Sequence, residues 1–230
     1  MKRRMFTRHR RRRSFWRTAA VLMIGAALVL AFQPRDAAPA VYPALFGTKE
    51  VRSDDLRPFP KWTGVLDRYF KEKDLPDGKC DSKRFNRCHL AEWKRFLAEI
   101  AAEPRRRQVE LVNRRMNSFP YITDRRNYGV EDYWATPRQF LYRDGDCEDY
   151  AIAKYMSLRA LGFTPEELRV VVLQDLNLRI AHAVLVVFLD EAGLILDNQI
   201  RQVVDQAKIR HYRPYYSINE TAWWLHKALK

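Results

Sequence analysis

Hydrophobic residues in the first half of the chain recur at helical spacing. Between positions 90 and 102, apolar side chains return every three or four residues, at Leu90, Trp93, Phe96, Leu97 and Ile100. This spacing places them on one face of a helix. Pro104 interrupts the pattern, and apolar positions resume over residues 105–117. We therefore predict two consecutive helices, each with one apolar side.

Capping residues mark two further helices. Pro137 opens the short apolar segment PRQFLY, and Thr136 before it is a suitable N-cap. A longer apolar-faced run over residues 147–161 follows the turn 143–146 and ends at Gly162, a residue typical of helix C-termini. We therefore expect a short helix and then a long one in this part of the chain.

After Gly162 the pattern changes to short β-branched runs, which predict strands. These runs cover residues 168–174, 182–189 (HAVLVVFL) and 194–196, and residues 190–193 between the last two are typical of a hairpin loop. The aromatic C-terminal segment, which contains Trp223 and Trp224, is predicted to be helical. Helices followed by antiparallel strands indicate the α+β class.

Two stretches show little periodicity. Residues 41–79 contain scattered prolines and charges, and we interpret them as an irregular lead-in with one short helix near Trp62–Tyr69. Residues 118–136 are rich in Asp, Asn and aromatic residues and are expected to form a loop. The main domain is then residues 80–230.

The first forty residues resemble an export signal. A basic segment, 1–17, precedes the uncharged apolar run Thr18–Phe32, and Ala38-Pro39-Ala40 suits a signal cleavage site. These three parts describe a secretory signal peptide at residues 1–40, and an uncleaved inner-membrane anchor is the alternative. In both cases we expect the body of the protein in the periplasm.

The charge of the chain is concentrated in that segment. The net charge is +14, and residues 1–40 hold ten basic residues against one acid. Without these residues, 32 basic and 27 acidic residues remain, a net charge of +5. Because no basic stripe interleaved with aromatics remains in the body, we do not expect nucleic acid as a partner.

The chain has three cysteines. Cys80 and Cys88 lie close together in a polar stretch, and in an exported protein such a pair is expected to form a disulfide. Two unpaired thiols and a zinc site with His89 are the alternatives, although no second pair of ligands is close. The disulfide would leave Cys147 alone, and an odd cysteine in an oxidising compartment calls for a use.

Cys147 stands where a nucleophile is expected. It begins a long helix after a Gly-Asp turn, and the partial positive charge of a helix N-terminus favours thiolate. His182 begins one predicted strand and Asp197 ends the next, so a hairpin would place the two side by side. A core cysteine, a satisfied histidine and an ordinary turn are the plain alternatives for each residue alone. Together the three match the geometry of thiol proteases.

Several segments resemble one known family. Tyr133-Trp134-Ala135-Thr136-Pro137, Gly145-Asp146-Cys147-Glu148-Asp149-Tyr150-Ala151, Ala181-His182-Ala183-Val184-Leu185 and Leu196-Asp197-Asn198 occur in the order and spacing of the bacterial transglutaminase-like cysteine proteinases. The resemblance extends from about Cys80 to the C-terminus. It implies a papain-like, transglutaminase-like fold in the periplasm, with Cys147 as nucleophile, His182 as general base and Asp197 as the residue that orients it. The best-known relatives release a large biofilm adhesin from the cell surface.

Carboxylates crowd the proposed nucleophile. Asp146 and Glu148 flank Cys147, and acids in this position raise the pKa of a thiol unless a cation compensates them. Oxygen ligands suit calcium, and the adhesin-releasing relatives resemble calcium-dependent enzymes that use these two positions. The upstream loop could add oxygens, from Asp124, Asn127, Glu131 and Asp132. The alternative is that the acids complement the helix dipole, an interpretation that suits Asp149.

The sequence therefore predicts a periplasmic cysteine peptidase that cleaves a protein substrate. A surface adhesin in biofilm control, with an inner-membrane receptor that regulates the enzyme, is the form that the resemblance implies. A transglutaminase with the same three residues and a non-catalytic binding domain are the alternatives.

Overall fold

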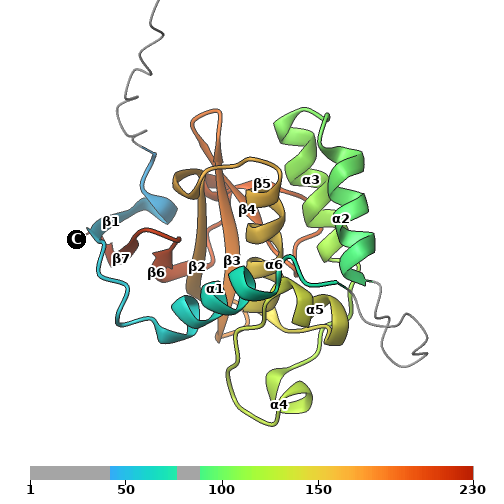
Figure 1. The fold of residues 1–230 in the computed structure, drawn as a ribbon. Coiled ribbons are helices and arrows are strands. Elements are labelled where there is room, and N and C mark those ends of the chain that lie inside the picture. Colours follow the sequence, from blue (N-terminus) through green and yellow to red (C-terminus); the bar gives the residue numbers. More distant parts are fainter. Residues whose placement is uncertain (1–41, 77–88, 230) are drawn as a thin grey trace, which may run out of the picture. The chain divides into compact units, whose positions relative to one another are not determined.

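The computed structural model describes residues 42–76 and 89–229, which form a seven-stranded antiparallel sheet with helices packed against it (Figure 1). The strand order is β1-β7-β6-β2-β3-β4-β5. The strands are β1 (Thr48–Ser53), β2 (Leu168–Asp175), β3 (Ile180–Leu189), β4 (Ala192–Leu196), β5 (Val204–Asp205), β6 (Tyr212–Ile218) and β7 (Trp223–Ala228). The helices are α1 (Pro60–Glu72), α2 (His89–Ile100), α3 (Arg105–Met116), α4 (Asp124–Asn127), α5 (Pro137–Arg143) and α6 (Cys147–Ala160). The predicted α+β class is confirmed.

Helix α6 is the central element of the helical layer. It packs against β2 and β3 of the sheet and against α3 and α5 (Figure 1). Every residue from Glu148 to Leu158 is buried, so this helix contacts protein on all sides. Its ends match the sequence prediction, because Gly162 beyond its C-terminus adopts a φ of 89°. The N-terminus of α6 is thereby fixed within the core.

Both faces of the sheet are covered, which explains the unbroken apolar run in β3. Val184, Val186 and Phe188 belong to one core, with Leu45 and Tyr212. Leu185 and Val187 point to the other core, which lies beneath the helices. A strand buried on both faces carries hydrophobic residues at successive positions instead of alternating ones. The strand prediction therefore holds although strict alternation is absent.

The helix predicted around Trp223 and Trp224 is wrong, because this segment is the strand β7. It pairs with β1 on one side and with β6 on the other. The buried His226 on this strand is hydrogen-bonded to the hydroxyls of Thr48 and Ser217, at 2.8 and 2.9 Å. Pairing with two distant strands outweighs the local helical pattern.

The segment expected to be irregular contains regular elements. Residues 48–53 form β1, an edge strand of the sheet, and the short helix predicted near Trp62–Tyr69 extends over Pro60–Glu72. The predicted signal segment and the proposed Cys80–Cys88 disulfide lie outside the described residues. Among the residues described, no helix is long and apolar enough to cross a membrane.

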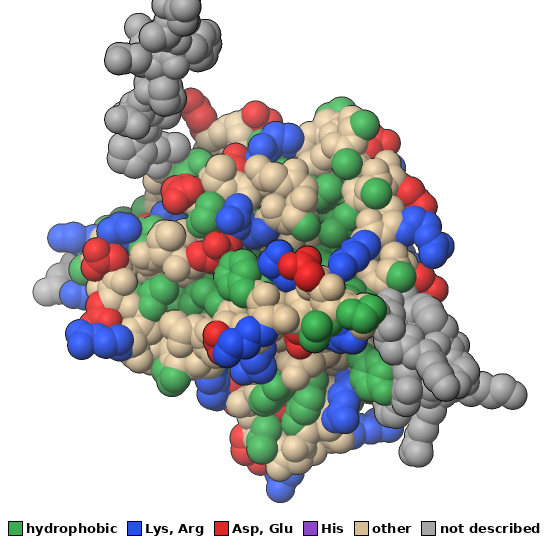
Figure 2. All heavy atoms as spheres, viewed as in Figure 1, with side chains coloured by type: hydrophobic (Ala, Val, Ile, Leu, Met, Phe, Trp, Pro, Cys, Tyr) green, Lys and Arg blue, Asp and Glu red, His purple; other side chains and the backbone are tan. Residues whose placement is uncertain are grey.

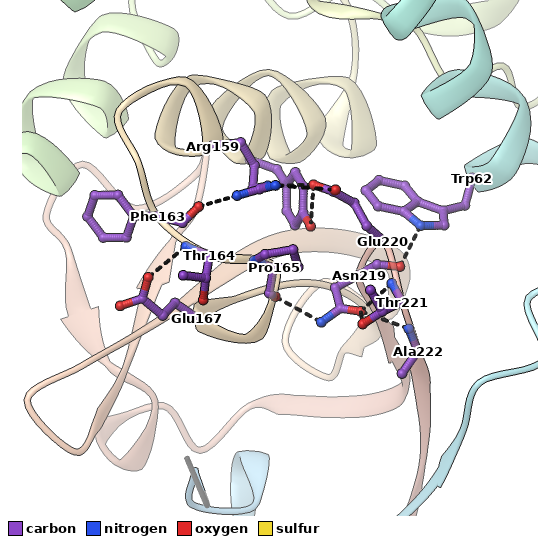
Figure 3. Close-up of polar contacts among 11 residues, drawn as sticks. Trp62, Arg159, Phe163, Thr164, Pro165, Glu167, Asn219, Glu220, Thr221 and Ala222 are labelled. Carbon is purple, nitrogen blue, oxygen red and sulfur yellow. Dashed lines mark hydrogen bonds and ion pairs between the residues drawn. The ribbon is translucent and has the colours of Figure 1, made fainter. Parts of the chain in front are cut away.

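A polar network attaches the β6–β7 turn to the end of α6 (Figure 3). Asn219 accepts hydrogen bonds from the backbone N–H groups of Thr221 and Ala222, both at 2.9 Å, and its amide donates to the carbonyl of Pro165. Glu220 pairs with Arg159 of α6 at 2.6 Å. These polar groups are satisfied, so we assign them a structural role. On the face viewed in Figure 2, basic and acidic side chains are interspersed.

Candidate active site

Cys147 is the first residue of α6, and the turn before it is tightly built. The buried carboxylate of Asp149 accepts hydrogen bonds from the backbone N–H groups of Ala135, at 2.7 Å, and Asp146, at 3.3 Å. A Cβ on Gly145 would lie 2.3 Å from the Asp149 carboxylate, so only glycine fits there. Asp149 thus fixes the helix start, in agreement with its interpretation as an N-terminal helix charge.

His182 and Asp197 lie side by side, as the hairpin prediction requires. Strands β3 and β4 pair in a register that aligns Leu189 with Ala192, and the two residues between them form the turn. His182 Nε2 lies 3.0 Å from Asp197 Oδ1. Both side chains are buried, with 3% and 0% of their residue surfaces exposed. The predicted neighbourhood is confirmed, while the catalytic roles stay predictions.

Asp197 is held by groups that sequence reasoning did not identify. Tyr212 on β6 donates its hydroxyl to Asp197 Oδ2 at 2.5 Å, and the backbone N–H of Gln199 donates to Oδ1 at 2.8 Å. Burial raises the pKa of Asp197, but hydrogen bonds from His182 and Tyr212 outweigh it and lower the pKa overall. Nothing in the local pattern links Tyr212 to Asp197, because Pro214 obscures the strand that carries the tyrosine.

Lys154 and Asn117 also lie near Asp197. The Asn117 amide donates to the Asp197 carbonyl at 2.7 Å. Lys154 is fully buried, and its amine has no hydrogen-bond partner among the described residues. Burial lowers the pKa of Lys154 to about 7, against the opposing effect of the Asp197 charge. A single lysine in an otherwise apolar-faced helix is the signal that could have identified this residue.

The structure brings Cys147 to the strand that carries His182. The backbone N–H of Ala183, next to His182, lies close enough to the cysteine sulfur to lower the pKa of the thiol. Because His182 Nε2 faces Asp197, Nδ1 is the remaining nitrogen for exchange of a proton with the thiol. The N-terminus of α6 therefore lies beside the strand that carries His182, and His182 contacts Asp197.

The surroundings of the Cys147 thiol, however, disfavour the thiolate. Cys147 Sγ donates to Glu148 Oε2 at 3.1 Å. Burial raises the pKa of Cys147, and the charges of Glu148 and Asp146 raise it further. The N–H of Ala183 and the helix dipole act in the opposite direction but do not compensate. Positive charge beside these acids would therefore favour thiolate formation.

The acids around Cys147 gather into a carboxylate cluster, formed by Asp124, Asp132, Asp146, Glu148 and Asp149. Oxygens of Asp124, Asp146 and Asp149 lie within 4.8 Å of one another, as do oxygens of Asp124, Asp132 and Glu148. One buried oxygen each of Asp124 and Asp146 has no hydrogen-bond donor among the described residues. Such acceptors, all of them oxygen, fit a hard cation such as calcium.

Burial and mutual repulsion disfavour ionisation of the cluster, which either a proton or a cation would relieve. Burial raises the pKa of Glu148 to about 9, and the charges of Asp146 and Asp149 add to the effect. Burial also raises the pKa of Asp124 to about 6. Ionised, these groups repel one another in a poorly solvated site.

Two residues expected from the upstream loop make contacts outside the carboxylate cluster. The Asn127 amide donates to the carbonyls of Arg143 and Asp144, at 3.1 and 3.2 Å. Glu131 forms an exposed ion pair with Arg125. Asp124 and Asp132 are therefore the loop residues that join the cluster.

Comparison with known proteins identifies the family of this chain. The profile of the bacterial transglutaminase-like cysteine proteinase family matches residues 79–226. No curated protein matches the chain. Among solved structures, LapG from Legionella pneumophila is similar, with 30% identity and a TM-score of 0.57 over 70% of this chain and 87% of that chain.

Two further LapG structures, both 30% identical to this chain, are described as calcium-bound and EGTA-treated. The calcium-bound structure has a TM-score of 0.57 over 70% of this chain and 87% of that chain. The EGTA-treated structure has a TM-score of 0.58 over 71% and 86%. Since the family profile spans more than half of its residues, this chain belongs to the bacterial transglutaminase-like cysteine proteinases and is a cysteine peptidase with a transglutaminase-like fold.

Proposed function

We propose that Cys147, His182 and Asp197 form the catalytic triad of a peptidase that hydrolyses a protein substrate. The observation that carries the proposal is the 3.0 Å contact between His182 and Asp197, beside a helix N-terminus that presents Cys147. Asp197 holds the imidazole in the tautomer that accepts a proton at Nδ1. The buried carboxylate also stabilises the imidazolium that forms.

The reaction follows from these positions. His182 accepts the thiol proton, and the sulfur of Cys147 attacks the peptide carbonyl. The backbone N–H of Cys147, free at the start of α6, donates to the oxyanion. His182 then protonates the departing amine, and a thioester remains on Cys147. Water attacks the thioester as His182 accepts its proton, and the carboxylic acid product leaves with the thiol regenerated.

We propose that the carboxylate cluster binds calcium through Asp124, Asp132, Asp146 and Glu148. The metal would supply positive charge beside Cys147 and hold the start of α6. A Glu148 carboxylate engaged in that way no longer accepts the thiol proton, which leaves His182 as the acceptor. The unpartnered oxygens of Asp124 and Asp146 support this proposal, as do the calcium-bound and EGTA-treated structures of the similar LapG.

We also propose a location and a substrate class. The export signal predicted from the first forty residues favours the periplasm, where a peptidase can reach proteins of the cell surface. The motifs that resemble adhesin-releasing proteinases favour a large surface adhesin as substrate, with a role in biofilm control and an inner-membrane receptor as regulator.

A peptide library derived from a proteome tests the proposed reaction. The wild type and Cys147→Ala are incubated with the library and calcium, and new termini are identified by mass spectrometry. We expect cleavage by the wild type and none by the variant, whose melting temperature should be unchanged. Equal cleavage by both proteins would exclude Cys147 as nucleophile. A parallel reaction with added methylamine distinguishes hydrolysis from acyl transfer, because transfer gives methylamide products.

A further inference from the structure

A basic cavity lies close to Asp197, whose backbone carbonyl accepts a hydrogen bond from the lining residue Asn117. It has a volume of about 720 Å³ and opens between α3 and the segment after β4. Arg114 and Asn117 line one wall, and Arg201 and Gln202 line the other. The α3 helix and the chain between β4 and β5 can be followed in Figure 1. We call this cavity the arginine pocket.

The two arginines of the pocket are available to a ligand. Arg114 and Arg201 are exposed, and neither guanidinium has a hydrogen bond or an ion pair within residues 42–76 and 89–229. The acid in the lining, Glu110, is already paired with Arg106 and Arg107 at 3.2 and 3.4 Å. The pocket therefore presents uncompensated positive charge.

Hydrogen bonds join the two walls of the pocket to each other and tie α3 to Asp197. Asn113 of α3 donates to the carbonyl of Arg201 at 3.2 Å, and Asn117 donates to the carbonyl of Asp197 at 2.7 Å. Asn113 is 1% exposed, so the first of these contacts is built into the core. Arg201 thus has a defined position relative to the proposed triad.

A short segment connects the pocket with the nucleophile. From Asn117 the chain runs to Tyr121, which pairs with Gly145 in the turn before Cys147. The N–H of Ile122 donates to the Gly145 carbonyl at 2.9 Å. Residues 117–121 span at most about 14 Å, the Tyr121–Gly145 bridge about 5 Å and residues 145–147 at most about 7 Å, so the pocket lies no more than about 26 Å from Cys147. An extended peptide bound at Cys147 covers this distance in about eight residues.

We propose that the arginine pocket binds an acidic side chain of the protein substrate, within about eight residues of the bond that is cleaved. Arginine pairs with carboxylates through two parallel hydrogen bonds, which gives geometric specificity as well as attraction. The inference rests on the proposed peptidase reaction and adds a specificity determinant to it.

The peptide library also tests this proposal. Among wild-type cleavage products we expect Asp or Glu to be enriched at one position near the cut. Arg114→Gln with Arg201→Gln should reduce cleavage of these peptides by about tenfold or more, while peptides without the acid are cleaved as before. Arg95→Gln with Arg210→Gln, two exposed positions outside the pocket, removes the same charge and should retain the preference. No enrichment, or equal enrichment in both double variants, would overturn the proposal.

A binding measurement separates this proposal from the peptidase reaction. The Cys147→Ala protein is titrated with an acetylated alanine pentapeptide that carries one glutamate, and the arginine side-chain NMR signals are followed. We expect the Arg114 and Arg201 signals to shift with glutamate and not with glutamine in its place. Absence of cleavage by the wild type, with glutamate-peptide binding retained in Cys147→Ala, would contradict the peptidase proposal alone. No shift, or equal displacement by the same concentration of inorganic phosphate, would contradict the acidic-side-chain site.

Discussion

The carboxylate cluster and the arginine pocket lie at opposite ends of the segment from Asn117 to Asp124, and they differ in burial as well as in charge. Asp124 and Glu148 are only 1% and 9% exposed, whereas Arg114 and Arg201 are exposed. Burial raises the pKa of Glu148 to about 9, so the cluster requires a proton or a cation. The exposed arginines remain charged in water without a partner.

This difference assigns different partners to the two regions. A buried group of like charges has too little solvent to stabilise it, so a small cation that enters the cluster also stabilises the fold. The exposed arginines of the pocket are solvated when no ligand is bound, so the fold does not depend on a ligand there. Such a pair is suited to select a substrate. We therefore expect the cluster to govern stability and thiolate formation, and the pocket to govern selectivity.

The largest expected effect comes from the residue between the two regions. Asp197→Asn should lower kcat by about 10³- to 10⁴-fold, because the amide no longer controls the tautomer of His182. Calcium binding and glutamate-peptide binding should persist, since neither region loses a charge. Asp190→Asn, on the exposed turn of the same hairpin, is the control. Unchanged kcat in Asp197→Asn would assign the orienting role to another group.

Lys154 is a buried base, so it tests whether burial or the sign of the charge makes ionisation unfavourable in the carboxylate cluster and not in the arginine pocket. Its pKa is lowered to about 7 from an ordinary 10.5, so the unfolded chain binds more protons between these values. The free-energy cost of burying a charged Lys154 amine is complete below about pH 7 and fades as the pH rises to 10.5. The free energy of unfolding should therefore increase across this window. Lys154→Met should remove this slope and stabilise the protein at pH 7 by a few kcal/mol.

Denaturant unfolding at several pH values measures this effect. Lys208→Met, at an exposed position, should leave the slope as it is in the wild type. A Lys154→Met protein with the wild-type slope would mean that the amine reaches solvent or a partner in solution.

Calcium should stabilise the protein through the cluster. At about 100 times the dissociation constant, a ligand contributes about 2.7 kcal/mol, which corresponds to a rise of several degrees in Tm. Asp146→Asn with Glu148→Gln should abolish the rise, and a chelator should reduce the activity of the wild type. Thermal scans with calcium, magnesium and EGTA measure this, and magnesium should substitute poorly. Activity without calcium binding would identify the acids as helix N-terminal charges.

A steric substitution can disturb the carboxylate cluster without changing the arginine pocket. In Gly145→Ala the new Cβ would lie 2.3 Å from the Asp149 carboxylate, so the turn before Cys147 must shift. We expect a loss of about 1–3 kcal/mol in the free energy of unfolding. Gly64→Ala in α1, where the Cβ would be 3.4 Å from the Arg68 guanidinium, should be neutral or slightly stabilising. Equal stability of the two variants would contradict the tight turn.

The smallest expected effect is that of salt on selectivity. The Debye length falls from about 10 Å at 0.1 M to about 3 Å at 1 M salt, which screens exposed charges. The preference for acidic peptides should therefore decrease several-fold over this range of NaCl. Stabilisation by calcium, which acts among buried groups, should decrease less. Library cleavage and thermal scans at both concentrations make the comparison, and the opposite order of sensitivity would refute the burial argument.

Elements with strong local signals could be predicted from the sequence. Thr136 caps α5, where its hydroxyl accepts from the N–H of Gln139 and the Gln139 side chain accepts from the N–H of Thr136. The β3–β4 hairpin placed His182 beside Asp197 because a tight turn determines the strand register. In both cases the interacting residues lie within one cap or one hairpin, so the local sequence pattern is sufficient to predict the contact.

The contacts that depend on distant segments could not be predicted. Tyr212 reaches Asp197 because β6 pairs with β2, which in turn pairs with β3. The C-terminal strand β7 acquires its structure from β1 and β6. Such pairings join residues far apart in sequence, and local propensity does not determine them.

By itself the sequence determined the long helix that begins at Cys147, the hairpin behind the His182–Asp197 pair, and the acids beside the cysteine. Each depends on periodicity, capping or turn chemistry within a few residues. Only the tertiary structure decided that Asp124 and Asp132 join Asp146 and Glu148, that Lys154 is buried near Asp197, and that Arg201 faces α3. The physical reason is that burial and electrostatic contact depend on which segments pack together, and packing is a property of the whole chain.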